Sequence, residues 1–217
     1  MVWREDMGEG RTSRSDVLRA SPPMFESRVL DALSRVHPAV PVLIFLPAIV
    51  LLTAWSLSNV SLLGTVGLFA GGYAFWTLFE YWLHRLVFHF EPEEGLGARM
   101  HWIIHGVHHD HPNDPMRLVM PPAVSVPLGL AVFGAMYALA GHDYAAGLGA
   151  GFFAGYLVYD MLHYYLHHFA PHGRLGRMLR ERHMRHHFQD DTKGFGISAP
   201  YWDDVFRTSP RAKRSSQ

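Results

Sequence analysis

The 217-residue sequence contains no cysteine. This absence excludes disulfide bonds, thiolate metal ligands and a cysteine nucleophile. Charged residues are also scarce, at 18% of the chain, against about a quarter in soluble domains. The 19 Lys and Arg residues balance 19 Asp and Glu residues, so no net cationic field is present to bind nucleic acid. Because 49% of the residues are hydrophobic, the composition indicates an integral membrane protein.

Four long segments of the sequence are free of charged side chains over most of their length. A helix rises about 1.5 Å per residue, so segments of this length approach the roughly 30 Å of a bilayer core. Pro121 and Pro122 open the third segment, and a helix N-terminus tolerates their missing N–H groups. We therefore predict four transmembrane helices at about residues 40–58, 62–83, 121–141 and 144–166.

Glycines recur every fourth residue inside two of these segments. Gly147, Gly151 and Gly155 lie in the fourth segment, and Gly67 and Gly71 lie in the second. Small residues at this spacing let two helices approach closely. We interpret them as packing positions without a chemical role.

The cationic residues predict the orientation, because Lys and Arg beside membrane spans are retained in the cytoplasm. None of the 19 lies in the turns at residues 59–61 or 141–143. Both termini and the long middle segment are therefore expected in the cytoplasm. Residues 1–37 are expected to form a flexible or surface-lying cytoplasmic N-terminal arm, because they are polar and too poor in apolar residues for a signal peptide.

We predict a single membrane-embedded domain over residues 38–217. Its fold class is all-α, and a cytoplasmic helical cap is expected from residues 84–120 and 167–217. The cap contains most of the sixteen histidines. Ten of them form two pairs where spans end and two HxxHH triads: His84 and His89; His105, His108 and His109; His163 and His167; His183, His186 and His187.

The helical period predicts how these rings are grouped. At about 100° per residue, the second and third rings of an HxxHH triad lie about 60° and 40° to either side of the first, so all three can converge on one point. His163 and His167 share one face at four-residue spacing. His84 and His89 are separated by about 140°, so either they serve different centres or the helix loosens between them.

Imidazole nitrogens suit iron, zinc, copper or nickel, and ten of them exceed what one metal needs. The pattern therefore predicts two metal ions. Glu80 precedes His84 by one turn and Asp160 precedes His163 by three residues, so both carboxylates are expected to accept a ring N–H from a ligand histidine. The sequence lacks paired Glu-x-x-His segments, so we expect a histidine-rich centre without bridging carboxylates.

Two metals at the ends of membrane helices favour one of two chemistries. Zinc would activate water for hydrolysis, whereas iron would activate dioxygen against a C–H bond. A lipid chain lies parallel to the spans, so the centre would meet the carbons nearest a head group. This placement favours oxygenation.

The motifs HxxxxH, HGVHHxxPxDxxRLVMPP, YDxxHYxxHH, HxxHH and KGFGISxPxWDxVF follow one another between residues 80 and 208. In this order they resemble the fatty acid 2-hydroxylases of the fatty acid hydroxylase and sterol desaturase superfamily. The resemblance implies a di-metal oxygenase that uses O2 and iron to hydroxylate the carbon alpha to an acyl carbonyl. It assigns the same ten histidines as ligands. Imidazole also accepts zinc readily in a purified sample.

The resemblance also implies partners. Many members of the family begin with a haem electron-transfer domain, which residues 1–37 are too short to hold, so we expect a separate electron-transfer protein. The expected substrate is a membrane lipid acyl chain, carried by a ceramide or other sphingolipid, a free acid, an ornithine lipid or lipid A. The 17 Arg against 2 Lys are typical of a bacterial protein, which would lie in the inner membrane; a eukaryotic one would lie in the endoplasmic reticulum.

Phe195, Tyr201 and Trp202 are expected to line the acyl-chain access route, with core packing as the alternative. Two other functions stay open at this point: oxidation of a sterol or hopanoid methyl group, and a non-catalytic membrane protein that binds metal or lipid. Metal transport is disfavoured, because the first and third spans contain no ionisable residue. None of these patterns indicates an oligomeric state.

Overall fold

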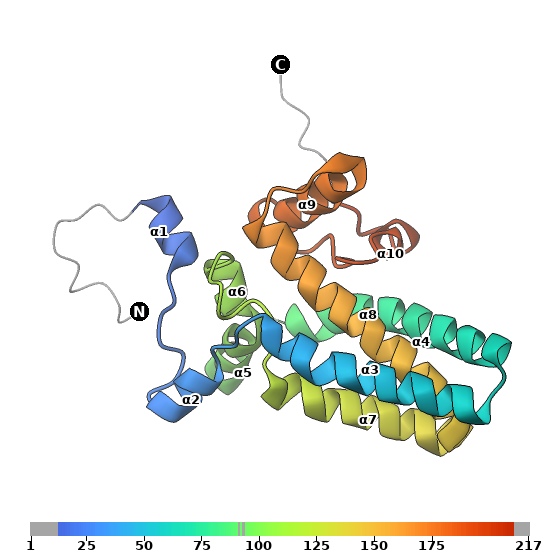
Figure 1. The fold of residues 1–217 in the computed structure, drawn as a ribbon. Coiled ribbons are helices and arrows are strands. Elements are labelled where there is room, and N and C mark those ends of the chain that lie inside the picture. Colours follow the sequence, from blue (N-terminus) through green and yellow to red (C-terminus); the bar gives the residue numbers. More distant parts are fainter. Residues whose placement is uncertain (1–12, 91, 93, 211–217) are drawn as a thin grey trace.

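The computed structural model describes residues 13–90, 92 and 94–210, and every regular element in these ranges is helical. Four long helices lie side by side as a bundle (Figure 1): α3 (Ala39–Asn59), α4 (Leu62–Leu83), α7 (Pro122–Ala140) and α8 (His142–His168). Each is long and apolar enough to cross a membrane, and α4 continues through a π-helical turn, η1 (His84–Phe88). The four predicted membrane helices are confirmed, and α8 extends beyond the predicted span at both ends.

Local sequence signals set the limits of these helices. Ser61 caps α4 by accepting a hydrogen bond from the Gly64 amide at 3.2 Å. Pro122 occupies the first turn of α7, where its missing N–H is tolerated. Gly141 separates α7 from α8 with a φ of 76°, a conformation that residues with a Cβ rarely adopt.

Helix α8 is the centre of the bundle, with 67% of its most apolar window buried against 11% in α7. A Cβ at Gly151 would lie 2.0 Å from the Phe69 carbonyl oxygen of α4, so only glycine allows this approach. Gly147 and Gly155 are similarly crowded, and the predicted packing role of the α8 glycines is confirmed. Gly67 has open space around it, so the prediction for that position is wrong.

Aromatic side chains from α3, α4 and α8 fill the space between the helices. Phe45 packs edge-on against Tyr156 at a ring separation of 4.6 Å, and Trp76 contacts the same ring at 5.3 Å. All three are at most 4% exposed. This cluster fixes the bundle directly beneath the histidines.

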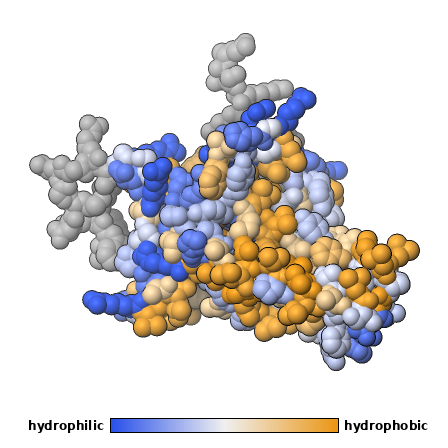
Figure 2. Space-filling model, viewed as in Figure 1, coloured by the Kyte–Doolittle hydropathy of each residue, from blue (hydrophilic) through white to orange (hydrophobic). Residues whose placement is uncertain are grey.

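The outer faces of the bundle are apolar. Leu43, Leu63 and Leu139 are 72%, 82% and 88% exposed, and Figure 2 shows a broad hydrophobic surface over α3 and α7. Exposed apolar area on this scale is unfavourable in water but matches lipid chains. The chain therefore has the surface of an integral membrane protein.

Shorter helices form a cap around the ends of α4 and α8. They are α5 (Gly95–His101), the π-helical turn η2 (Trp102–Gly106), α6 (Val107–Asp110), α9 (Gly173–Phe188) and α10 (Tyr201–Val205). Arg182 ties α9 to the start of α10 by donating to the Pro200 carbonyl at 3.1 Å. The cap thus brings two segments, residues 95–110 and 173–205, against the membrane bundle.

The N-terminal segment also packs against the cap, through α1 (Arg14–Arg19) and α2 (Arg28–Leu33). The Asn113 amide donates to the Leu18 carbonyl at 2.9 Å, and the Val36 amide donates to the Met116 carbonyl at 2.6 Å. Met24 and Val36 are buried. Of the two expectations for this arm, residues 13–37 match a segment lying on the surface of the protein rather than a flexible one, because both helices are exposed and hydrogen bonds tie them to the cap. Residues 1–12 lie outside the described chain.

Replacing Gly151 with alanine should destabilise the protein by about 1–3 kcal/mol, because the new methyl group overlaps the Phe69 carbonyl. Gly67→Ala is the matched control, since nothing lies within 4 Å of a Cβ there. Unfolding in detergent micelles, followed by circular dichroism, measures both. Equal stability of the two variants would contradict the close approach of α4 and α8.

Candidate metal centre

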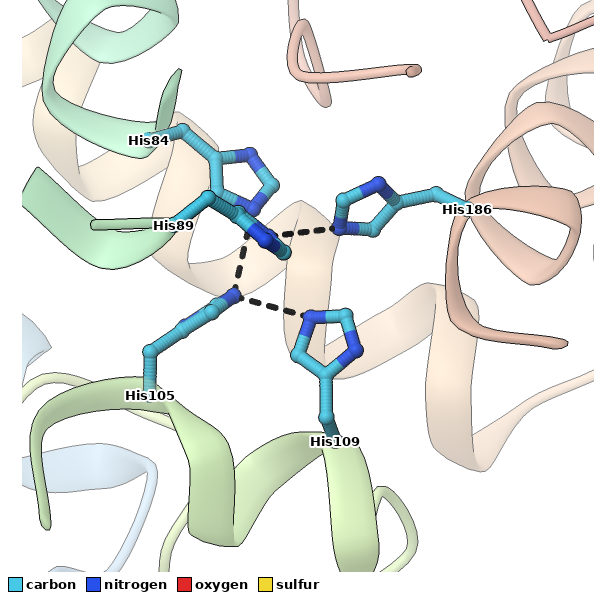
Figure 3. Close-up of side chains that lie close together, drawn as sticks. All are labelled: His84, His89, His105, His109 and His186. Atoms are coloured by element: carbon cyan, nitrogen blue, oxygen red, sulfur yellow. Dashed lines mark hydrogen bonds between the residues drawn. The ribbon is translucent and has the colours of Figure 1, made fainter. Parts of the chain in front are cut away.

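All ten histidines singled out from the sequence converge in two adjoining groups of five. Within each group the nearest ring nitrogens all lie within 4.8 Å of one another. Group A, shown in Figure 3, contains His84, His89, His105, His109 and His186. Group B contains His108, His163, His167, His183 and His187.

Each HxxHH triad is divided between the two groups. His105 and His109 belong to group A, whereas His108 belongs to group B. Residues four apart share a helix face, but His108 is rotated by about 100° from His109 and points elsewhere. The prediction that the three rings of a triad converge on one point is therefore wrong.

The second triad divides in the opposite sense. His183 and His187, four residues apart on α9, belong to group B, and His186 crosses to group A. Each triad thus gives two rings to one group and one ring to the other. The rings of His109 and His187 stack at 4.3 Å where the groups adjoin.

A π-helical turn brings His84 and His89 into one group. The His89 amide donates to the His84 carbonyl at 3.1 Å, five residues earlier, which widens the helix and reduces the angle between the two rings. Of the two possibilities for this pair, a loosened helix is the one found. A second π-helical turn, η2, contains His105.

The ring nitrogens of group A face one another. The Nε2 atom of His105 lies 3.2 Å from His84 Nε2 and 3.0 Å from His109 Nε2, as the dashed lines in Figure 3 mark. His89 Nε2 lies 3.1 Å from His186 Nε2. In group B, His183 Nε2 lies 2.7 Å from His167 Nε2 and 3.1 Å from His187 Nε2.

Backbone carbonyls fix the protonation of two rings in group A. His84 Nδ1 donates to the Phe195 carbonyl at 2.8 Å, and His186 Nδ1 donates to the Lys193 carbonyl at 2.7 Å. A carbonyl only accepts, so the proton of each neutral ring lies on Nδ1 and the lone pair of Nε2 points inward. These inward lone pairs fit a bound cation.

Burial keeps the rings neutral. It lowers the pKa of His105 and of His183 well below the usual imidazole value, with further repulsion from neighbouring histidines. Burial also lowers the pKa of His186 to about 4. Neutral imidazole is the form that binds metals. In group B, buried nitrogens of His163, His167, His183 and His187 have no hydrogen-bond partner within the described chain.

The loop that supplies the two carbonyls is held from both sides. Glu80 of α4 accepts hydrogen bonds from the Ile197 and Ser198 amides, both at 2.8 Å, and from the Ser198 hydroxyl. Asp203 of α10 accepts from the Phe195 and Gly196 amides at 2.9 and 3.0 Å. These two carboxylates position the loop that orients His84 and His186.

The predicted carboxylate partners of histidine are therefore wrong in detail. Glu80 acts through the loop instead of binding His84. Asp160 accepts from the Met120 amide and the Tyr156 hydroxyl, both at 3.2 Å, and so joins α8 to the chain before α7. The sequence reasoning missed Asp203, although it lies in the KGFGISxPxWDxVF motif.

The three predicted access-route aromatics pack elsewhere. Phe195 is 4% exposed, and its ring lies 5.5 Å from that of His89. Tyr201 and Trp202 both donate to the Thr77 hydroxyl, at 2.9 and 3.1 Å. None of the three lines the main cavity. Core packing, the alternative, is found for Phe195, whereas Tyr201 is 50% exposed.

The main cavity has a volume of about 250 Å³ and is lined mostly by apolar residues. At its inner wall lie His105 of group A and His108 and His163 of group B. A guest in this cavity would therefore meet both histidine groups. Apolar side chains of α2, η2 and α7 form its other walls.

Known proteins are similar to this chain in sequence. The family model described as fatty acid hydroxylase matches residues 69–208. The dihydroceramide fatty acyl 2-hydroxylase FAH1 of Arabidopsis thaliana is 40% identical over 90% of this chain and 83% of its own length. The ceramide very long chain fatty acid hydroxylase SCS7 of Saccharomyces cerevisiae is 37% identical over 88% of this chain and 50% of its own length.

The fold has a solved counterpart. A structure of full-length scs7p, in which only the hydroxylase domain is visible, superposes with a TM-score of 0.80 at 36% identity. The match covers 86% of this chain and 72% of that one. Sequence and fold therefore agree over the helical bundle and its cap.

The division of the triads can be tested by metal content. His105→Ala/His109→Ala removes two rings from group A alone and should lose half of the bound metal. His105→Ala/His108→Ala removes one ring from each group and should weaken both sites. Elemental analysis of the purified proteins, with and without a competing chelator, distinguishes them. Identical metal loss in the two double variants would indicate that each triad binds one metal.

Proposed function

The chain belongs to the fatty acid hydroxylase family, and on this premise we propose that it is a lipid acyl 2-hydroxylase, an oxidoreductase with a di-iron centre. The ten histidines of groups A and B hold the two iron ions. O2 is the oxidant, and the substrate is the acyl chain of a membrane lipid. The FAH1 and SCS7 relatives are named for dihydroceramide and ceramide, which makes a sphingolipid the first substrate to test.

The single observation that supports this function is the contact between the apolar cavity and both histidine groups. His105, His108 and His163 lie at its wall, and the adjoining apolar wall includes Phe88 and Val119. An acyl chain fits such a lining, whereas a hydrophilic substrate would lose its hydration without compensating hydrogen bonds. The lining therefore selects a hydrocarbon and presents it beside the histidines.

The residues of the chain position the substrate and exclude water. Leu118 and Val119 are 7% and 1% exposed and close the wall behind the histidines. Asp160 fixes the Met120 amide next to them, so this wall is rigid. A cavity with a fixed and mostly apolar wall limits where a C–H bond can lie.

Bound iron would supply the activation of O2. The overall reaction breaks the C2–H bond, forms a C2–OH bond with one oxygen atom, and reduces the other atom to water. Two electrons and two protons balance this reaction. We propose that an external electron-transfer protein delivers the electrons.

We also propose that the cap and both termini face the cytoplasm, and that residues 38–217 act as one domain. The turn at residues 59–61 and the turn at Gly141 both lie at the end of the bundle away from the cap (Figure 1), and neither carries a cation. This arrangement follows the retention of Lys and Arg on the cytoplasmic side. The metal centre then meets the acyl carbons nearest the head groups of the cytoplasmic leaflet.

Lipid mass spectrometry with 18O2 tests the reaction. Cells that express the protein with iron and a competent reductase should contain acyl chains that gain one labelled oxygen at C2. His108→Ala removes a ring of group B that also lines the cavity, and the labelled product should be absent. Glu26→Gln, an exposed change outside both groups, is the control. A labelled sterol or hopanoid, or no product with wild type, would contradict 2-hydroxylation.

The proposed orientation can be tested with single cysteines, because the natural chain has none. Cysteines at Asn59 and His142 should react with a membrane-impermeant reagent added to the extracytoplasmic side. A cysteine at Ser15 in α1 should react only after the membrane is opened. The reverse pattern would invert the topology.

A further inference from the structure

The mouth of the cavity lies between an extramembrane helix and the first turn of a membrane span. Leu30 and Leu33 of α2 and Ala123 and Val124 of α7 all line the cavity and are all exposed, which places the opening between these two helices. Because α7 begins at Pro122, this mouth lies at the boundary where lipid head groups meet the chain. Helix α2 therefore borders the opening of the cavity at the surface of the bundle.

Residues 22–36, which contain α2, form a strap whose two ends are hydrogen-bonded to two adjacent residues. Arg117 donates to the Pro22 carbonyl before α2, and the Val36 amide donates to the Met116 carbonyl at 2.6 Å after it. Both ends of the strap, residues 22–36, are thus anchored on residues 116 and 117. Because only its two ends are held by these bonds, the strap could swing away from the cavity if the contact at α2, between the two ends, were broken.

One partly buried ion pair holds the middle of the strap. Arg117 Nη2 lies 2.8 Å from Asp31 Oδ1 of α2, and the side chains are 2% and 16% exposed. Asp31 also accepts from the Met24 amide at 2.7 Å and so folds the strap onto itself. A single guanidinium therefore joins the start of the strap and its helix to the cavity wall.

The outward face of α2 is apolar. Val29, Leu30 and Leu33 are 68%, 50% and 60% exposed, although α2 has only six residues. In Figure 2, orange atoms gather at the place that α2 occupies in Figure 1. Val124, 47% exposed at the start of α7, continues this apolar surface into the membrane span. Such a helix is typical of one that lies in a bilayer interface.

We propose that α2 lies on the bilayer surface as a lid over the cavity, held closed by the Arg117–Asp31 ion pair, and that the acyl chain enters from the leaflet beneath it. The bilayer is the occupant that the geometry favours, because the apolar face of α2 is continuous with a membrane span. The guest's identity as an acyl chain rests on the proposed function. The position of α2 on the membrane does not.

Lipid contact of α2 is measured with a fluorophore on Val29→Cys, which is exposed and outside the cavity lining. The protein is placed in vesicles of phosphatidylcholine and phosphatidylglycerol that contain nitroxide-labelled lipid. Quenching should be several-fold stronger than for the same fluorophore on Ser15→Cys, an exposed site in α1. Equal quenching at the two sites would overturn the proposal, and docking of a protein instead of lipid would give this result.

The Arg117–Asp31 ion pair, the latch of the lid, is tested by electron paramagnetic resonance of a spin label at Val29→Cys, which reports the mobility of α2. Adding Asp31→Asn should increase the mobile fraction of the label, because Arg117 keeps only the longer ion pair with Asp114 at 4.0 Å and no longer holds α2 by charge. Adding Glu26→Gln, an exposed change on the same strap, should leave the spectrum unchanged. Unchanged mobility in Asp31→Asn, with metal content equal to that of the parent protein, would overturn the latch. Neither measurement needs catalytic activity, so its failure is distinct from failure of the hydroxylase function.

Discussion

The reciprocal division of the two HxxHH triads is the constraint on which the rest of the structure depends. His108 leaves its own triad for group B, and His186 leaves its triad for group A. Neither group can be completed by one cap segment alone, so α6 and α9 must lie against each other and against the ends of α4 and α8. The close approach of α4 and α8 at Gly151 then serves the centre as well as the bundle, because both helices end in ligand histidines.

The Nδ1 atoms of His84 and His186, which face away from the other rings, show how backbone geometry orients the ligands of the centre. Phe195 and Lys193 contribute carbonyl oxygens, so the identity of their side chains is secondary to the path of the loop. Gly194 lies between them with a φ of 83°, which a residue with a Cβ would adopt only under strain. Glu80 and Asp203 hold the same loop through its amides. The orientation of the His84 and His186 rings therefore depends on the hydrogen bonds by which Glu80 and Asp203 hold this loop.

Sequence reasoning identified the membrane helices and the ten histidines because both leave local signals. Uncharged runs are visible residue by residue, and HxxHH spacing places rings on one side of a helix. Four-residue spacing pairs His105 with His109 and His183 with His187. Which group the remaining rings, His108 and His186, would join had no such signal, since it depends on which neighbouring helix each ring meets. The same holds for the strap: the contact between Arg117 and Pro22 joins residues far apart in the chain. The π-helical turn at His84 left a partial signal, the five-residue spacing.

The choice of ligand explains why carboxylates surround the centre without entering it. Ten neutral imidazoles would leave the charge of the two proposed metal ions uncompensated, which would preserve their strength as Lewis acids. Glu80, Asp160 and Asp203 are each at most 2% exposed, yet their oxygens accept hydrogen bonds from backbone amides and neighbouring hydroxyls. Ionised there, they would supply counter-charge at a distance and lower the cost of burying cations near a bilayer. A metal-loaded centre would thus be both strongly cationic and stable within an apolar protein.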